Sequence, residues 1–259
     1  MSQSYQTQGI VLARKDFGEN DRLLTLLTPD LGIIKAIAPG SRKYHSSLRG
    51  RIELFVVNEL MLVKGRSLDR LIQVQTVNSH IRLCRNLYKL SSAQYLAELV
   101  LLIGLSEQPQ VELYELLLEY LGLIESNEVP QLLIVHLSKA VFRLLTMAGI
   151  GPCVDRCCLT QEFLLPDPSR HDDYLGFSNS DGGIIKIDSS NTVCEAKLGS
   201  IELSLLQYLG SSLLLDYDLP ELQSTWYKIE QILREYAQYH FNYSFRSSLL
   251  LGGLSQGDL

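Results

Sequence analysis

The spacing of apolar residues changes near residue 80, and this change limits the folds open to the chain. From Tyr5 to about Ser79 apolar residues recur with the short period of strands, whereas beyond His80 they recur every three or four positions, as in helices. Turn residues rich in Gly, Asn, Asp and Pro divide the first part into five apolar runs. Five short strands in roughly 75 residues suit a small closed barrel, because closure removes unpaired sheet edges. The runs are Gly9–Ala13, Arg22–Thr28, Ile33–Ala38, Ile52–Val63 and Leu68–Val77.

The strand pattern favours a five-stranded OB-like barrel and leaves an SH3-like barrel open. The later pattern predicts helices over 87–103, Val111–Ile124, Gln131–Met147, Ser200–Leu209 and Pro220–Tyr243. We therefore expect an α+β fold with an N-terminal OB-like β-barrel followed by a mainly α-helical domain that carries a loop-rich insert. The expected segments are a barrel in 1–80, a helical domain in 81–150, the insert in 151–198, and C-terminal helices in 199–259 that pack on the helical domain.

Charge is distributed unequally along the chain. The net charge is −6, but residues 1–82 carry 12 Lys and Arg against 7 Asp and Glu, and the remainder carries 11 against 22. A uniformly acidic protein would repel nucleic acid. A basic module joined to an acidic one instead confines a polyanion to one surface, so the barrel is the expected nucleic-acid-binding part.

Seven cations of the predicted barrel form the most informative cluster. The loop Ser41–Gly50 contains no acidic residue, so a simple solvated surface explains the cluster less well than contact with a phosphate backbone. Phe17, Tyr44 and Phe55 are candidates for base stacking, although Phe55 fits the core better. The predicted DNA contacts are Arg14, Lys15, Lys35, Arg42, Lys43, Arg49 and Arg51.

Catalytic motifs are absent from the sequence. It contains no Gly-rich phosphate loop with Lys-Ser/Thr, no G-x-S-x-G elbow and no H-E-x-x-H pair, and its five histidines are scattered. We therefore expect a protein that is not an enzyme. The longest strongly apolar stretch, Tyr95–Leu105, has about half of the roughly 20 residues that a membrane helix needs, so we expect no membrane association. The N-terminus lacks the features of a secretory signal, which makes the cytoplasm the expected compartment.

The five cysteines are an odd number without secretory context, which favours free thiols over a disulfide framework. Cys153, Cys157 and Cys158 lie close enough in sequence to share one zinc ion. A tetrahedral site needs a second closely spaced pair, however, and Cys194 and His171 are the downstream candidates. We therefore expect no bound metal and no cofactor.

Five short patterns in the first third of the chain occur together in a characteristic order. They are Gly9-Ile10-Val11-Leu12, Phe17-Gly18-Glu19-Asn20-Asp21, Leu26-Leu27-Thr28 followed by Gly32, Pro39-Gly40-Ser41-Arg42, and Ser47 followed by Leu54-Phe55. In this order and spacing the N-terminal part resembles that of the RecO family. Later features also fit the family, namely Pro152, Asp155 and Cys157, Phe177-Ser178 before Gly182-Gly183, and Arg246-Ser247.

The resemblance implies a role in DNA recombination and in the repair of DNA damage. RecO proteins have an OB-fold N-terminal domain, bind single- and double-stranded DNA, anneal complementary strands, and act with RecR and single-strand-binding protein to load RecA. Some members hold zinc on two C-x-x-C pairs. Here Thr160, Lys186 and Ser189 stand at three of the four ligand positions, so the insert resembles a degenerate zinc finger that holds no metal.

The resemblance also implies a site for the acidic, Phe-ending tail of single-strand-binding protein. Such a peptide needs cations beside an apolar slot. Lys139 and Arg143 lie four residues apart on the third expected helix, with Phe142 and Leu145 nearby, and are the predicted partner-binding residues, although simple solvation explains either cation equally well. The alternative function is that of a protein-interaction adaptor whose barrel binds peptide, and an enzyme with an unrecognised site is a third reading.

Overall fold

The computed structural model describes residues 3–167, 175–187, 193–211 and 222–247. The chain divides into two compact units, residues 1–125 and 126–259, which are described separately below. The first unit contains the five N-terminal strands together with two long helices, and the second contains the remaining helices and a small sheet. The finer division into four segments therefore stays a prediction.

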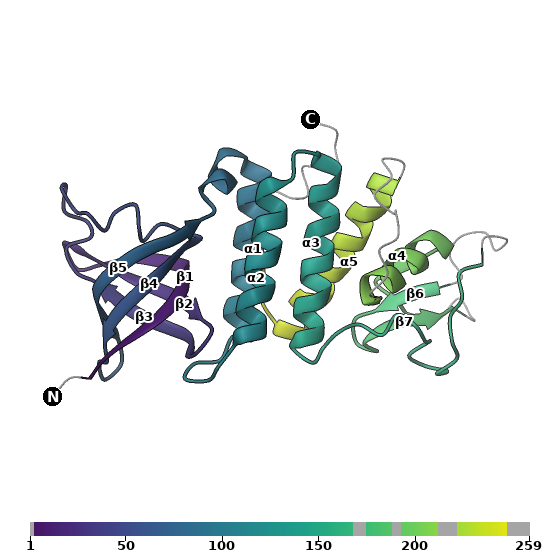
Figure 1. Cartoon of the computed structure of the whole chain (residues 1–259). Helices are drawn as coiled ribbons and strands as arrows, with labels where there is room; N and C mark the ends of the chain where they lie inside the picture. The colour runs from purple at the N-terminus through teal and green to yellow at the C-terminus, as the bar shows by residue number, and fades with distance from the viewer. Residues whose placement is uncertain (1–2, 168–174, 188–192, 212–221, 248–259) are drawn as a thin grey trace. The chain divides into compact units, whose positions relative to one another are not determined.

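Five strands of the first unit close into a barrel, as the apolar pattern predicted (Figure 1). Their order around the barrel is β1-β2-β3-β5-β4, and β4 returns to pair with β1. The contact between β3 and β5 is parallel and the others are antiparallel, which is the Greek-key order of an OB-like barrel. The strands are β1 (Ser4–Phe17), β2 (Asp21–Thr28), β3 (Gly32–Ala38), β4 (Val56–Val63) and β5 (Asp69–Ser79).

The long first strand serves both halves of the barrel. Its first half pairs with β4 and its second half with β2, and the register shifts between Val11 and Ala13. Such an irregularity bends a strand, which allows β1 to turn from one sheet to the other. The barrel core is filled by aliphatic side chains, among them Leu24, Leu26 and Leu62, none of which is exposed to solvent.

The loop 39–55 between β3 and β4 contributes apolar side chains to the barrel core. Ile52 is fully buried there, and Leu48 and Leu54 pack against the same cluster. The prediction that a strand begins at Ile52 was wrong. Phe55 has a positive φ of 63°, which breaks an extended strand, and it is anchored instead by a hydrogen bond from its N–H to the carbonyl of Val11.

Two helices pack on the barrel within the first unit. The short 3₁₀ helix η1 (Ile81–Arg85) leads to α1 (Leu87–Ile103), and α2 (Val111–Ser126) follows. The side chain of Asn86 caps α1 by accepting hydrogen bonds from the N–H groups of Tyr88 and Lys89. The segment between α1 and α2 holds the β2–β3 turn through backbone hydrogen bonds, including one of 2.8 Å from Ile33 N to Leu105 O.

The second unit combines three helices with a small sheet. Helices α4 and α5 both pack against α3. The three-stranded sheet, of order β7-β6-β8, lies inside the segment 151–198 that was expected to be irregular. Strands of three or four residues are too short to produce a readable alternation, which is why the sequence pattern missed them. The elements are α3 (Pro130–Met147), β6 (Leu175–Ser178), β7 (Gly183–Lys186), β8 (Ala196–Leu198), α4 (Ser200–Gly210) and α5 (Gln223–Phe241).

Within the described ranges, no helix combines the length and the apolar character that crossing a membrane requires.

Candidate nucleic-acid interface

The register of the barrel strands decides which cations face solvent. Alternate side chains of β2 point into the core, with Leu24 and Leu26 fully buried, so the residues between and beside them face outward. Lys15 of β1 and Lys35 of β3 lie in register with two of these outward positions. Both lysines are exposed, which contact with a phosphate backbone requires. They therefore share the outer surface formed by β1, β2 and β3.

Strand β5 adds an arginine that the sequence reasoning missed. Arg70 is exposed and lies in register with Ile37 across the parallel contact between β3 and β5. No local pattern could have revealed this proximity, because the contact exists only after the barrel has closed. We call the combined surface the outer basic face, which consists of Lys15, Leu23, Thr25, Lys35, Ile37 and Arg70.

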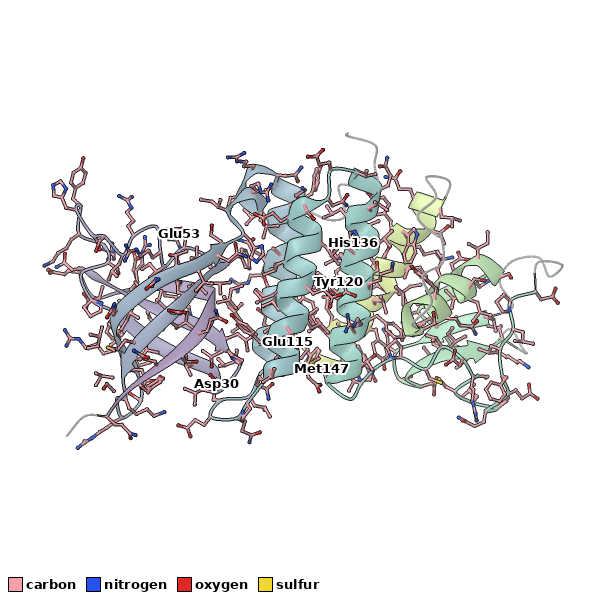
Figure 2. The ribbon with its side chains drawn as sticks, viewed as in Figure 1. Asp30, Glu53, Glu115, Tyr120, His136 and Met147 are labelled. Carbon is pink, nitrogen blue, oxygen red and sulfur yellow. The ribbon has the colours of Figure 1, made fainter. Side chains whose placement is uncertain are left out.

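Arg14 is engaged within the barrel. Its guanidinium forms an ion pair with Glu53, and Arg22 Nη1 lies 3.6 Å from the same carboxylate. Figure 2 shows Glu53 at one end of the barrel and Asp30, in the β2–β3 turn, at the opposite end. Glu53 therefore partly neutralises both Arg14 and Arg22. As a result, Arg14 attracts a phosphate less strongly than an unpaired cation would.

Arg42 anchors the loop 39–55 to the β1–β2 turn. Its Nη2 atom lies 3.1 Å from Asp16 Oδ2, and its Nη1 atom donates a hydrogen bond of 3.0 Å to the carbonyl of Gly18. The N–H of Gly40 donates to Asp21 Oδ1 at 2.8 Å, which adds a second anchor. The loop 39–55 thus contacts carboxylates of two neighbouring strands, Asp16 of β1 and Asp21 of β2, although its segment Ser41–Gly50 contains no acid.

Lys43 and Arg49 are the cations of this loop that remain free. Both are exposed, and among the described residues neither has an ion-pair or hydrogen-bond partner for its side chain. Tyr44 follows Lys43 in the chain and has 84% of its surface exposed, and its ring meets that of His45 edge to face with the centroids 4.7 Å apart. An exposed ring beside free cations is the combination that single-strand binders use, because bases stack while phosphates are neutralised.

The other residues predicted to contact DNA or stack on bases lie in different parts of the barrel. Arg51 points toward β5, where its Nη1 atom donates a hydrogen bond of 3.0 Å to the carbonyl of Val74. Phe17 is 40% exposed at the end of β1, so its ring is available for stacking. Phe55 is fully buried. The structure thus brings Lys15 and Lys35 together on one face and places the Arg51 side chain, from the loop 39–55, against β5.

Two family models match this chain in succession. The model described as "Recombination protein O N terminal" matches residues 1–80, and the model described as "Recombination protein O C terminal" matches residues 84–249. The chain belongs to the RecO family. Relatives named "DNA repair protein RecO" are 47% identical in Gloeothece citriformis (strain PCC 7424), over all of both chains, and 41% identical in Nostoc sp. (strain PCC 7120), over 97% of this chain and 96% of the relative.

Membership of the RecO family makes this chain a DNA repair and recombination protein. A third relative of the same name, from Trichodesmium erythraeum (strain IMS101), is 43% identical over 97% of this chain and 94% of its own length. The family is one of repair proteins and not a known class of catalytic enzymes, which agrees with the absence of catalytic motifs.

The predicted partner-binding residues of this RecO chain lie on α3. Lys139 is half-buried, and its Nζ atom donates a hydrogen bond of 2.7 Å to the hydroxyl of Tyr208 while lying 4.6 Å from the centroid of that ring. Arg143 is exposed on the same helix. Phe142 and Leu145 are buried in the core of the second unit, so the apolar slot expected from them is not on the surface. Any apolar slot beside Arg143 has to come from other side chains.

The cysteines of the insert lie in contrasting environments. Burial raises the pKa of the Cys157 thiol, but hydrogen bonds from Thr160 and from the N–H of Lys186 outweigh burial and lower that pKa. Burial and the nearby Cys153 raise the pKa of Cys158 to about 12. Lys186, at one of the former ligand positions, forms an ion pair with Glu162.

Three of the positions at which the resemblance would place zinc ligands lie close together, because Thr160 and the N–H of Lys186 both hydrogen-bond the Cys157 thiol, but two of the three side chains are not those of typical zinc ligands. Within the part of the chain that the structure describes, no group of three or more His, Cys, Asp or Glu side chains is arranged to hold a metal ion. Ser189 and His171 lie outside the described residues.

Proposed function

We propose that this RecO-family chain binds single- and double-stranded DNA through the outer basic face and the loop 39–55, and that it anneals complementary strands. The observation that carries the proposal is the exposure of Lys15, Lys35, Lys43 and Arg49, none of which has an ion-pair partner among the described residues. Each free cation can replace condensed counterions on a phosphate backbone, which gives affinity with little sequence preference. OB barrels commonly bind oligonucleotides on the face of β2 and β3, where Lys35 lies and which Lys15 of the neighbouring strand β1 adjoins.

The chain acts in this proposal as a mediator and not as an enzyme. It works with RecR and single-strand-binding protein to load RecA onto single-stranded DNA during recombinational repair. Membership of the RecO family supports these partners. The acidic remainder of the chain, with 11 Lys and Arg against 22 Asp and Glu after residue 82, supports protein contacts outside the barrel, because that surface repels DNA.

Strand annealing provides the test of this proposal. Two complementary oligonucleotides, one with a fluorophore and one with a quencher, should pair faster in the presence of the protein, and the Lys43→Ala/Arg49→Ala variant should lose most of that acceleration. Arg85→Ala is the matched control, because Arg85 is an exposed cation of η1 outside the barrel. Annealing that is unaffected by the protein, together with unchanged DNA binding in the double variant, would favour the peptide-binding adaptor.

We also propose that Arg143, with Lys139 behind it, receives the acidic tail of single-strand-binding protein. Arg143 is exposed and Lys139 is half-buried, so Arg143 presents more of its side chain to a peptide and should contribute more of the affinity. Fluorescence anisotropy with a labelled tail peptide tests the assignment. Charge reversal by Arg143→Glu should weaken peptide binding strongly and leave DNA binding to the barrel intact, and unaltered peptide affinity would move the site elsewhere.

A further inference from the structure

A polar groove lies on the barrel away from β2 and β3. It has a volume of about 370 Å³ and is formed by the first half of β1 together with β4 and β5. Two rows of outward-facing residues cross these three strands in register. The first row is Gln6, Met61 and Gln73, and the second is Gln8, Glu59 and Gln75.

A second hollow of about 420 Å³ continues this groove along β5. The two hollows share Gln73 and Gln75, and Arg51 borders the second one. The hydrogen bond from Arg51 to the carbonyl of Val74 fixes the guanidinium at this border. The two hollows therefore form one surface, with amide groups along it and a single guanidinium at its side.

Glutamine is concentrated in this groove. The first 80 residues contain five glutamines, and four of them line the groove. The hydroxyl of Tyr114 donates a hydrogen bond of 3.4 Å to Gln8 Oε1. The side-chain amides of Gln6, Gln73 and Gln75 have no partner among the described residues, so their donors and acceptors are available to a ligand.

The chemistry of this lining suits base edges better than phosphates. An amide offers donors and an acceptor side by side, which matches the mixed donors and acceptors on the edge of a base. The Glu59 carboxylate at the centre of the second row repels phosphate, but it can accept hydrogen bonds from the amino group of cytosine. Arg51 beside the groove can bind the phosphate that follows such a base.

We propose that this glutamine groove is a second nucleic-acid site, which contacts the bases of a single strand while Arg51 contacts its backbone. The inference rests on the proposed function and deepens it. A protein that anneals strands has to hold two of them. The outer basic face centres on β2 and β3, whereas the glutamine groove is formed by the first half of β1 together with β4 and β5. The groove then holds a strand through its bases, and the outer basic face holds a strand through its phosphates.

The experiment compares two single-stranded probes of equal length, one with bases and one abasic at every position. Both carry the same phosphates, so a base-contacting site separates them and a phosphate-contacting site does not. The Gln73→Ala/Gln75→Ala variant removes two amides from exposed strand positions, so it should leave the fold intact. Circular dichroism of the variant checks its fold. Gln108→Ala, at an exposed glutamine outside the groove, is the matched control.

Wild-type protein should bind the base-bearing probe more tightly than the abasic one. The double variant should lose roughly tenfold in affinity for the base-bearing probe, as expected for two hydrogen bonds to uncharged groups, and nothing for the abasic probe. Its dependence on salt should be unchanged, because no charge has been removed.

Other outcomes separate the two proposals. If the wild-type protein binds the abasic probe as tightly as the base-bearing one, and the double variant behaves identically, the groove inference is overturned while DNA binding stands. If neither probe binds at all, the proposed function itself has failed. A variant that binds both probes normally but loses the tail peptide of single-strand-binding protein would make the groove a peptide site and overturn the inference.

Discussion

Gly32 occupies a position that no other residue type can fill without strain. Gly32 has a positive φ of 65°, and a Cβ atom there would lie 2.0 Å from the carbonyl oxygen of Leu105. This oxygen also accepts the hydrogen bond from Ile33 that ties the β2–β3 turn to the segment after α1. Only glycine permits both the backbone conformation and the close approach.

Substitution of Gly32 tests this requirement. Gly32→Ala should destabilise the first unit by roughly 3 kcal/mol, because a backbone strain and a steric clash add together. Gly18 is the matched control, since its φ is 61° but nothing lies within 4 Å of its missing Cβ. Gly18→Ala should lower the free energy of unfolding by about 1 kcal/mol, from the backbone strain alone. Thermal unfolding followed by circular dichroism measures both, and equal costs would contradict the role assigned to the Leu105 contact.

Glu230 on α5 is a buried acid whose ionisation is linked to stability. Burial raises its pKa to about 7, although Arg234, with its Nε atom 3.1 Å away, opposes the shift. Because the folded pKa lies above the unfolded value near 4.5, the folded state holds the proton more tightly. The stabilising contribution is therefore complete below about pH 4.5 and is lost as the pH rises through about 7.

The Glu230→Gln variant isolates this contribution. The free energy of unfolding of the wild-type protein should fall, relative to that of the variant, by roughly 3 kcal/mol between pH 4.5 and pH 8. Trp226 is the single tryptophan of the chain and is buried on α5, so its fluorescence reports on the second unit during urea unfolding. A difference between the two proteins that stays constant over this pH range would refute the assignment.

At the scale of whole elements, the loop 39–55 is the segment in which structural and binding roles overlap. Arg42 is paired with Asp16, whose side chain is 61% exposed, so the pair contributes less than about 1 kcal/mol to stability. Asp16→Asn should release the Arg42 guanidinium for phosphate. Affinity for single-stranded DNA should then rise, and the slope of log affinity against log salt should become more negative by up to roughly 0.7.

A double-mutant cycle separates this effect from the loss of a negative charge near DNA. In the Arg42→Ala background, Asp16→Asn should change the slope much less, because Arg42 is missing and Arg22, whose Nε atom lies 3.9 Å from Asp16, remains near Glu53. If the slope changes equally in both backgrounds, Arg42 makes no phosphate contact and serves only to hold the loop.

The elements with long apolar patterns were predictable from the sequence. Alternation over β2, β3 and β5 and helical spacing over α1, α2 and α3 are the direct consequence of one buried face in each element. The predicted start of the fourth strand at Ile52 was wrong, because the residues just before β4 bury their apolar side chains without having an extended backbone. Strands β6, β7 and β8 have four, four and three residues, which leaves no room for a pattern.

The candidate site was predictable only in part, because ion pairs depend on contacts between distant segments. Lys15 and Lys35 are exposed as expected, since lysine on the outward side of a strand reaches water. Arg14 and Arg42 are paired with Glu53 and Asp16 through contacts between strands and loops that local sequence does not reveal. Arg70 and the glutamine groove require the closed barrel, and no local pattern indicates either.

At the scale of the whole molecule, charge is distributed unequally along the chain. The barrel segment is basic and the remainder is acidic, which under the proposed function directs DNA to the barrel and protein partners to the other part of the chain. Under the same proposal, a protein with a net charge of −6 binds a polyanion through exposed cations of the barrel, among them Lys15, Lys35, Lys43 and Arg49.

The salt dependence of single-stranded DNA binding tests this central claim most directly. Anisotropy of a labelled oligonucleotide, measured from low to moderate salt, should give a log–log slope of about −3 or steeper for the wild-type protein, given roughly −0.7 for each phosphate contact. Replacing Lys15, Lys35, Lys43 and Arg49 with alanine should weaken binding and make the slope less negative by roughly 3, whereas Arg85→Ala should leave it unchanged. A slope near zero in the wild-type protein, or one that the fourfold variant does not alter, would contradict DNA binding by this surface.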